Sequence, residues 1–440
     1  MSHVCCRCHE NADSLFSSSS GFNNYRGILN LCIILLVLSS TRVALENVIK
    51  YGILMDPVIL IQACVRDPYN WPCFSLILFS NFFILSAHHI EVQLSKDYFS
   101  ENLGCWLHIF NLAVVICFPA INVLYVHPSP VFSSVALACY TAVFLKLISY
   151  KQVNKWCRLD AATACTRPSR LRQRSVSAAA TSVPGNMKGY ILQDKLTLVF
   201  LLLFSDLYYF MFAPTLCYQL NFPRSARIRK RFLIKRILEM IFLWGLMIGL
   251  VQQWIVPTVN NSVVPFQQLQ LSRIVERLLK LAVPNHLIWL MFFYWLFHSC
   301  LNVVAELMRF GDRVFYLDWW NAETVQYFWK NWNIPVHKWA SRHLYKPMLS
   351  HGYTKMQANI AVFVLSAFFH EYLVSVPLRM FRVWAFMGLI GQIPFAMFVD
   401  RFLDGKTGNM AVWMSLIIGQ PIAILMYYHD YYVMHLTAPE

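Results

Sequence analysis

The sequence predicts an all-α protein that crosses a membrane several times, and two observations lead to this fold class. The first is composition: 58% of the 440 residues are hydrophobic and only 13% are charged, whereas a soluble domain carries roughly 25% charged residues. Such a chain exposes a large apolar surface, which lipid solvates and water does not. The second is that apolar runs of about 20 residues, the length of a membrane-spanning helix, recur along the whole chain.

We predict a polytopic bundle of nine transmembrane helices. The predicted spans are 28–48, 72–90, 104–126, 131–150, 237–258, 278–305, 359–378, 382–402 and 411–435. A tenth apolar stretch, 196–220, would place two basic loops on opposite sides of the membrane if it crossed, and Pro214 and Pro223 interrupt this part of the chain. We therefore expect it to be re-entrant or to lie in the interface, packed against protein.

The net charge of +15 is concentrated in a few loops. In a membrane protein this pattern indicates topology and contact with anionic headgroups more than nucleic-acid binding. The basic loops 151–236 and 308–355 should face the cytosol, with a flexible linker at 160–190. Segment 1–27 is then a cytosolic tail, 28–435 the membrane domain and 436–440 a luminal terminus.

No metal site or disulfide framework is predicted. The thirteen cysteines are scattered, and several lie inside apolar runs, where a thiol behaves as a small hydrophobe. The run 5–9 (CCRCH) lacks a second ligand pair at matching spacing, and His88 and His89 are adjacent, which does not place two ligands on one helix face. No phosphate-binding loop and no nucleophile elbow is present.

The most informative candidate residue is His370, at the middle of the apolar run 359–378. An ionisable group at this depth usually faces the bundle interior or a water-filled cavity, although a histidine bonded to a neighbouring helix would look the same. The adjoining Glu371 favours a solvated cavity. A neutral histidine can accept a proton from an alcohol.

A second constellation is the aromatic stretch 315–321 (FYLDWWN), followed by 328–339 (FWKNWNIPVHKW). It could form an amphipathic interfacial helix, in which Trp and Tyr commonly anchor. The interleaved Asp318, Asn321, Asn333 and His337 are unnecessary for an anchor. They favour a ligand site, where cations meet phosphates and aromatic rings stack on a base.

Other polar groups inside apolar runs give weaker signals. His298, Asn302 and Glu306 are spaced by four residues and share one helix face. This face could line a cavity or pair with another helix. Gln420 precedes Pro421 within the last span, and its amide could reach a cavity or bond to a neighbouring helix.

Residues 315–321 resemble the FYxDWWN motif of the membrane-bound O-acyltransferases that esterify diacylglycerol and sterols, and His370 matches the essential histidine of that family. The resemblance extends from about Asp13 to the C-terminus. It implies a nine-helix bundle with a tunnel through the endoplasmic reticulum membrane, assembled as a homodimer or homotetramer. Acyl-CoA would enter from the cytosol and diacylglycerol from the bilayer, and no cofactor or metal is implied.

The resemblance also implies residue roles. His370 would be the general base, Asn333 would hold the thioester or stabilise the oxyanion, and Glu371 would orient His370. The expected substrate contacts are Phe315, Tyr316, Asp318, Trp319, Trp320, Asn321, Trp332, His337, Tyr345, Lys355 and Gln420. The chain departs from the family at three places: Lys330 stands in place of Gln, Asn359 in place of Arg, and the apolar run 196–204 is longer.

Two alternative functions remain open at this point. One is an acyltransferase for retinol, monoacylglycerol, fatty alcohol or sterol. The other is a lipid transporter without catalytic activity, in which His370 gates the pathway or relays protons. Release of free CoA would separate the enzyme from the transporter.

Overall fold

A computed structural model describes residues 26–56, 72–166 and 204–436, and almost all of them are helical. The chain divides into two compact units, Met1–Leu54 and Met55–Glu440. The described part of the first unit is essentially one helix, α1 (Arg26–Tyr51). The tail segment 5–9, most of the predicted linker 160–190 and residues 196–203 of the longer apolar run lie outside the described residues.

Seven helical segments within the described residues are long and apolar enough to cross a membrane. They are Cys73–Ser95, Glu101–Val126, Pro130–Asp160, Leu271–Leu307, Lys355–Leu378, Trp384–Phe402 and Gly405–Met434. The all-α, polytopic fold class is thereby confirmed. The predicted spans 28–48 and 237–258 are also helical but are not among these seven, so the count of nine is not confirmed.

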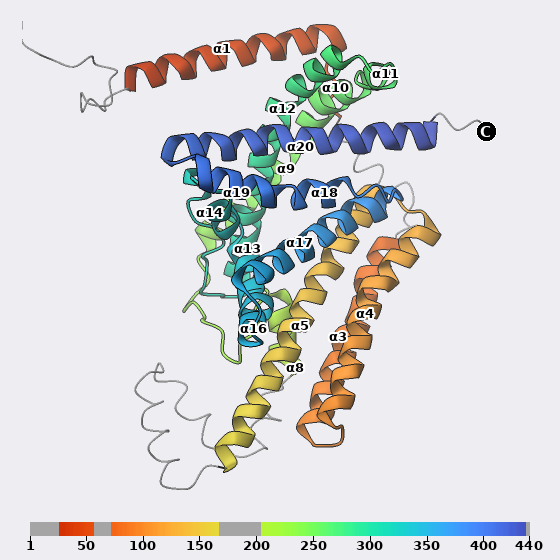
Figure 1. The fold of residues 1–440 in the computed structure, drawn as a ribbon, viewed down its shortest axis with the longest axis vertical. Helices are drawn as coiled ribbons and strands as arrows, with labels where there is room; N and C mark the ends of the chain where they lie inside the picture. Colours follow the sequence, from red (N-terminus) through yellow and green to blue (C-terminus); the bar gives the residue numbers. More distant parts are fainter. Residues whose placement is uncertain (1–25, 57–71, 167–203, 437–440) are drawn as a thin grey trace, which may run out of the picture. The chain divides into compact units, whose positions relative to one another are not determined.

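Three long helices of the second unit run side by side: α3 (Pro72–Ser95), α4 (Glu101–Val126) and α5 (Pro130–Thr166) (Figure 1). Their shared core includes Phe83, Val115 and Tyr140, and the Tyr140 hydroxyl donates to the Leu76 carbonyl at 2.7 Å. Helix α5 continues to Thr166, so it extends into the first residues of the predicted linker 160–190. A helix that leaves the membrane needs no further apolar residues, so hydropathy does not mark its end.

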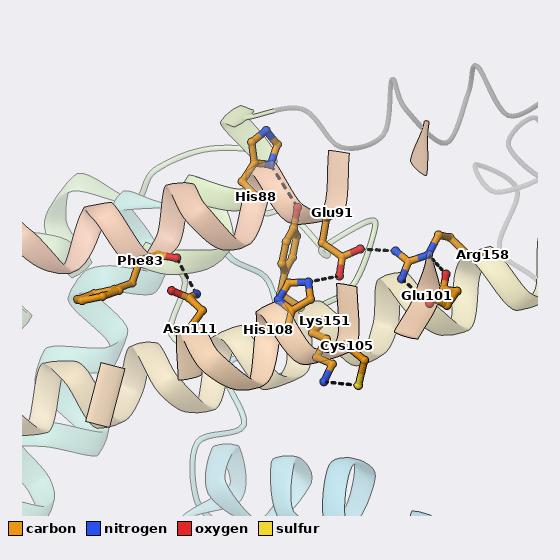
Figure 2. A network of polar contacts seen from close by, with 10 residues as sticks. Phe83, His88, Glu91, Glu101, Cys105, His108, Asn111, Lys151 and Arg158 are labelled. Atoms are coloured by element: carbon orange, nitrogen blue, oxygen red, sulfur yellow. Dashed lines mark hydrogen bonds and ion pairs between the residues drawn. The ribbon is translucent and has the colours of Figure 1, made fainter. Parts of the chain in front are cut away.

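A buried polar network ties these three helices together at one end (Figure 2). Glu91 of α3 is fully buried and forms ion pairs with His108 of α4, at 2.9 Å, and with Arg158 of α5. Arg158 also pairs with Glu101 at the start of α4, at 2.8 Å. Burying a carboxylate is costly unless charged partners compensate it, and here each of the other two helices supplies a partner.

The short helix α8 (Phe204–Phe212) packs against α5 through Leu207 and Phe210. Because residues 196–203 lie outside the described part of the chain, the prediction that segment 196–220 does not span stays a prediction. Lys146 of α5 is buried and donates to the carbonyls of Phe210, Met211 and Ala213 at 2.8–2.9 Å. These carbonyls end the helix and have no partner within it, so the ammonium group caps α8.

The middle of the chain contains two long helical runs that π-helical turns interrupt. The first comprises α9 (Lys230–Leu250), η2 (Val251–Ile255) and α10 (Val256–Asn260). After α11 (Val263–Gln267), the second comprises α12 (Leu271–Phe293), η3 (Tyr294–Cys300) and α13 (Leu301–Leu307). A π-helical turn carries one extra residue and changes which side chains face a neighbour.

The C-terminal part begins with short elements in the segment predicted as the second cytosolic loop. These are η4 (Trp319–Asn321), α14 (Val325–Asn331), α15 (Ile334–Ala340), η5 (Ser341–Tyr345) and α16 (Lys346–Ser350). Four helices follow: α17 (Lys355–Leu378), α18 (Trp384–Ile390), α19 (Gln392–Phe402) and α20 (Gly405–Leu436). The predicted span 382–402 is thus two helices that meet at Gly391.

Candidate active site

An aromatic cluster joins the FYLDWWN segment to the membrane helices. Trp319 is only 3% exposed, and its ring meets those of Trp289 on α12, Phe328 on α14 and Trp413 on α20, with centroids 5.5–5.8 Å apart. The ring of Trp332 extends the cluster, because it stacks on Phe328 and lies 6.3 Å from Trp289. Within the motif, Trp319 is therefore part of the protein core.

Hydrogen bonds fix the conformation of the motif. The Tyr316 hydroxyl lies 2.9 Å from His298 Nδ1 of η3. Asp318 accepts from the Tyr327 hydroxyl at 2.8 Å, and this bond lowers the pKa of the exposed Asp318 carboxyl. Two roles were considered above for the helix face that carries His298: lining a cavity or pairing with another part of the protein. At His298 the structure shows pairing, with Tyr316.

Asn333 caps helix α15, and this role occupies the oxygen of its side-chain amide but not the nitrogen. Its Oδ1 accepts from the Val336 backbone N–H at 3.2 Å. The oxygen that caps the helix is thereby turned toward the backbone, and the Nδ2 group remains to donate elsewhere. An amide fixed in this way is suited to donate to a developing negative charge.

His370 lies on α17, which begins with a capping box formed by Thr354 and Gln357. The side chain of His370 is exposed, and its Nδ1 lies 2.8 Å from the Ser366 carbonyl. A carbonyl can only accept, so Nδ1 carries the proton and Nε2 is left with a free lone pair. This is the tautomer that a general base requires.

The face of α17 that carries His370 also contacts the aromatic cluster. Phe363 lies seven residues, or about two turns, before His370, so the two side chains share a face. The ring of Phe363 meets Trp329 of α14 at 6.0 Å, and Trp329 in turn meets Trp332 at 5.8 Å. The chain of contacts from Trp332 to Phe363 links the motif to the histidine helix.

Glu371 is engaged elsewhere. Its carboxylate accepts from the backbone N–H groups of Val383 and Phe386 at 3.1 and 3.0 Å, and from the Tyr427 hydroxyl at 2.8 and 2.9 Å. Ser375 also donates to it. The carboxylate thus caps the start of α18 and ties it to α17 and α20. These contacts support a positioning role for Glu371, while its predicted action on His370 stays a prediction.

Gln420 of α20 accepts from the Asn285 amide of α12 at 3.2 Å. It lies seven residues after Trp413, so it shares the face of α20 that contacts Trp319. Of the two interpretations of Gln420, the helix–helix hydrogen bond is observed, and the same contact holds its amide beside the aromatic cluster.

The remaining predicted contact residues differ in accessibility. Trp320, Asn321 and Lys355 are exposed, Phe315 is buried, and Tyr345 in η5 is half-buried.

His337 is half-buried, and burial together with the charge of Lys330 lowers the pKa of its imidazole. The departure from the family at Lys330 therefore has an electrostatic effect on a predicted contact residue.

Sequence reasoning missed four residues of the cluster or beside it: Trp289, Phe363, Trp413 and Asn285. Each lies in an apolar helix or next to the motif, where an aromatic or amide side chain has an ordinary structural explanation. Spacing was the available signal. Phe363 and Trp413 lie seven positions, about two helical turns, before His370 and Gln420, so each shares a helix face with a predicted site residue. Within the described residues, no three His, Cys, Asp or Glu side chains are grouped so that they could hold a metal ion.

The described residues form an all-α bundle in which the helix that carries the exposed His370 meets, through Phe363, an aromatic cluster around the buried Trp319. This arrangement is compatible with a membrane-embedded enzyme. Residues 70–429 match the family described as MBOAT, membrane-bound O-acyltransferase. The chain belongs to this family.

Among its relatives, diacylglycerol O-acyltransferase 1 of Chlorocebus aethiops is 59% identical, over 98% of this chain and 85% of the relative. The protein of the same name from Homo sapiens is 58% identical, over 98% and 86%. The one from Dictyostelium discoideum is 35% identical, over 95% and 64%.

Proposed function

We propose that this protein is an acyl-CoA:diacylglycerol O-acyltransferase, which forms triacylglycerol and free CoA. The observation that carries the proposal is His370, on an apolar helix, with Nδ1 held by the Ser366 carbonyl and Nε2 free. The relatives named diacylglycerol O-acyltransferase 1, which match nearly the whole chain, support the choice of diacylglycerol as acceptor.

In the proposed mechanism His370 Nε2 takes the proton of the free diacylglycerol hydroxyl as its oxygen attacks the thioester carbonyl of acyl-CoA. The new C–O bond forms, the C–S bond breaks, and the imidazolium returns the proton to the CoA thiolate. General-base catalysis of this kind contributes about 10²- to 10⁴-fold. Orientation of the two substrates supplies a further part of the rate enhancement. The mechanism uses neither a cofactor nor a covalent acyl-enzyme.

Asn333 supplies the second catalytic group. With Oδ1 occupied as a helix cap, Nδ2 is oriented to donate to the oxyanion that develops on the thioester carbonyl. The aromatic and polar residues of 315–339 would bind the two substrates, acyl-CoA from the cytosolic face and diacylglycerol from the bilayer. The exposed Lys355 would meet a phosphate of CoA.

The test uses membranes from cells that make no triacylglycerol of their own. Membranes containing the parent protein, His370→Ala or His351→Ala receive labelled oleoyl-CoA with diacylglycerol, retinol, monoacylglycerol, a fatty alcohol or cholesterol. His351 is a matched control, because its Nδ1 also bonds to a carbonyl four residues earlier, Pro347 at 2.7 Å, but outside the apolar run. Ester formation and CoA release are measured.

We expect triacylglycerol from the parent and from His351→Ala, and none above background from His370→Ala expressed at the same level. Preferential esterification of another acceptor would reassign the substrate. Absence of any ester and of any CoA release from folded parent protein would favour the transporter alternative.

We also propose that the protein resides in the endoplasmic reticulum membrane as a homodimer or homotetramer, with its N-terminus in the cytosol. The family resemblance and the basic loops support this placement. Native mass spectrometry of the purified protein would give the number of subunits, and a strictly monomeric protein would contradict the assembly.

A further inference from the structure

A pocket of about 360 Å³ lies between the segment that precedes α9 and the segment that follows α13. Three of the six residues that line it are arginines. The lining residues are Ser225, Ala226, Arg227, Arg229, Gly311 and Arg313. The proposed acyl transfer gives none of these residues a role.

The walls of the pocket are held together by backbone hydrogen bonds. Ser225 N–H donates to the Arg309 carbonyl at 2.7 Å, and Gly311 N–H donates to the Pro223 carbonyl at 2.7 Å. A Cβ atom at Gly311 would lie 3.0 Å from that same carbonyl oxygen, so this close pairing favours glycine. The two segments are therefore fixed relative to one another, and the pocket is part of the fold.

The positive charge of the pocket exceeds the negative charge beside it. Glu306 is fully buried and pairs with both Arg229, at 3.0 Å, and Arg313. Arg309 donates to the carbonyls of Ser225 and Ala226, which are neutral. Arg227 is exposed and has no ion pair or hydrogen bond with any residue that the structure describes.

Four arginines thus lie in or beside the pocket, against a single carboxylate, that of Glu306. The nearby Asp312 does not compensate them, since it pairs with Lys338 at 2.8 Å.

The start of α9 is already compensated, because the Arg229 backbone N–H donates to the Glu306 carboxylate. One further feature favours an anionic ligand. The Ser225 hydroxyl is buried and has no hydrogen-bond partner among the described residues. Guanidinium groups bind phosphate through paired hydrogen bonds, and a hydroxyl can add one more.

The position of the pocket along the helices indicates where its ligand comes from. Glu306 and the adjacent Leu307 end the candidate span Leu271–Leu307. Helix α9 carries four basic residues over 230–236 and is apolar from Ile237 onward except for Glu239, which pairs with Arg236. Both boundaries mark the level at which a chain passes from hydrocarbon to headgroups.

We propose that this pocket binds the phosphate group of an anionic phospholipid headgroup. Arg227 supplies a free guanidinium, Arg229 and Arg313 supply fixed positive charge around Glu306, and the pocket opens at the height of the lipid phosphates. The proposal is independent of the proposed acyl transfer, because binding is measured without acyl-CoA or diacylglycerol.

The experiment uses the full-length protein in detergent, titrated with short-chain phosphatidylglycerol, short-chain phosphatidylcholine or inorganic phosphate, with microscale thermophoresis as the readout. Arg227→Ala removes the free guanidinium. Arg231→Ala is the matched control, because it removes the same charge from an exposed site on α9 that does not line the pocket.

We expect phosphatidylglycerol to bind more tightly than phosphatidylcholine, and Arg227→Ala to weaken phosphatidylglycerol binding about tenfold, the loss typical of one hydrogen bond to a charged group. Arg231→Ala should bind as the parent does. Equal affinities of the parent and Arg227→Ala would overturn the proposal, as would an equal loss in the control. Displacement of the lipid by inorganic phosphate at the same concentration would overturn the assignment to a headgroup.

Discussion

At the residue scale, Asn333 serves two purposes with one amide, and its two ends can be tested separately. Asn333→Asp keeps an oxygen that caps α15 but loses the amide donor, whereas Asn333→Ala loses both. We expect Asn333→Asp to retain the thermal stability of the parent while kcat falls about 10²- to 10³-fold, the usual effect of removing one oxyanion donor. Activity assays and melting temperatures measured in parallel check this.

Asn333→Ala should lower kcat to a similar extent and also cost about 1 kcal/mol of stability, since the cap is lost. If Asn333→Asp were as active as the parent, Asn333 would act only as a cap.

His343 gives a pH-dependent prediction. It is buried, its Nε2 lies 2.8 Å from Ser149 Oγ and its Nδ1 lies 2.7 Å from Gln152 Oε1. Burial, with a smaller contribution from the charge of Arg342, lowers the pKa of His343 from 6.5 to about 4. The unfolded chain therefore binds a proton more readily than the folded one, and stability is complete above about pH 6.5 and declines toward pH 4.

The decline attributable to His343 should reach about 2 kcal/mol near pH 5, from ~1.4 kcal/mol per pKa unit. Unfolding temperatures at about pH 7 and about pH 5 would be compared for the parent and His343→Gln, whose amide cannot be protonated in this range. A slope that is unchanged in His343→Gln would show that other groups cause the acid sensitivity.

Sequence reasoning at this scale identifies candidates where chemistry and environment disagree. His370 is such a candidate, because an ionisable residue in an apolar run is unusual. The orientation of Asn333 was not predictable, because it depends on which end of the side-chain amide meets the Val336 N–H. The predicted action of Glu371 on His370 stays a prediction. Its contact with the start of α18 could not be read from the sequence, because that contact depends on how α17 and α18 pack.

At the element scale, Lys146 is the side chain on which the placement of α8 most depends. Lys146→Met would keep the length of the side chain but leave the carbonyls of Phe210 and Met211 without their donor, whereas the Ala213 carbonyl also accepts from Thr215 N–H. A buried polar group left unpaired costs about 1–3 kcal/mol, so we expect a loss of at least about 2 kcal/mol. Lys151→Met is the control on the same helix, since among the described residues the Lys151 ammonium has one hydrogen-bond partner, the Cys105 thiol at 3.5 Å.

Thermal unfolding in detergent, with limited proteolysis around α8, measures the effect. A Lys146→Met protein as stable as Lys151→Met would show that water replaces the ammonium group.

The sequence predicted helices where hydropathy is high. It did not predict where these helices contain π-helical turns, extend beyond the bilayer or break. The apolar runs located both ends of α3, α4, α17 and α20 to within about six residues. The predicted span 278–305 covers part of α12 and continues through η3 into α13. Hydropathy contains no information about a π-helical turn, the extension of a helix beyond the bilayer, or a break between two equally apolar helices. Packing and hydrogen bonding decide these features.

At the scale of the whole molecule, an odd number of crossings places the two termini on opposite sides of the membrane. The basic loops predict a cytosolic N-terminus and a luminal C-terminus. We expect an N-glycosylation sequence added after Glu440 to be modified and the same sequence added before Met1 to remain unmodified. Both would be made in an Asn260→Gln background, which removes the native sequence at 260–262.

A mobility shift that glycosidase treatment reverses reports the modification. Modification of the N-terminal version alone would invert the topology and place the arginine pocket on the luminal side.

The π-helical turn η3 has a consequence for how insertions and deletions are tolerated in this protein. Because this turn holds one residue more than an α-helical turn, loss of one residue between Tyr294 and Cys300 would let it close into regular α-helix. The face of α13 that carries Glu306 would then keep its direction toward Arg229 and Arg313. Loss of one residue from the regular helix α13 before Glu306 would instead rotate Glu306 by about 100°, so single deletions should be tolerated more readily in η3 than in α13.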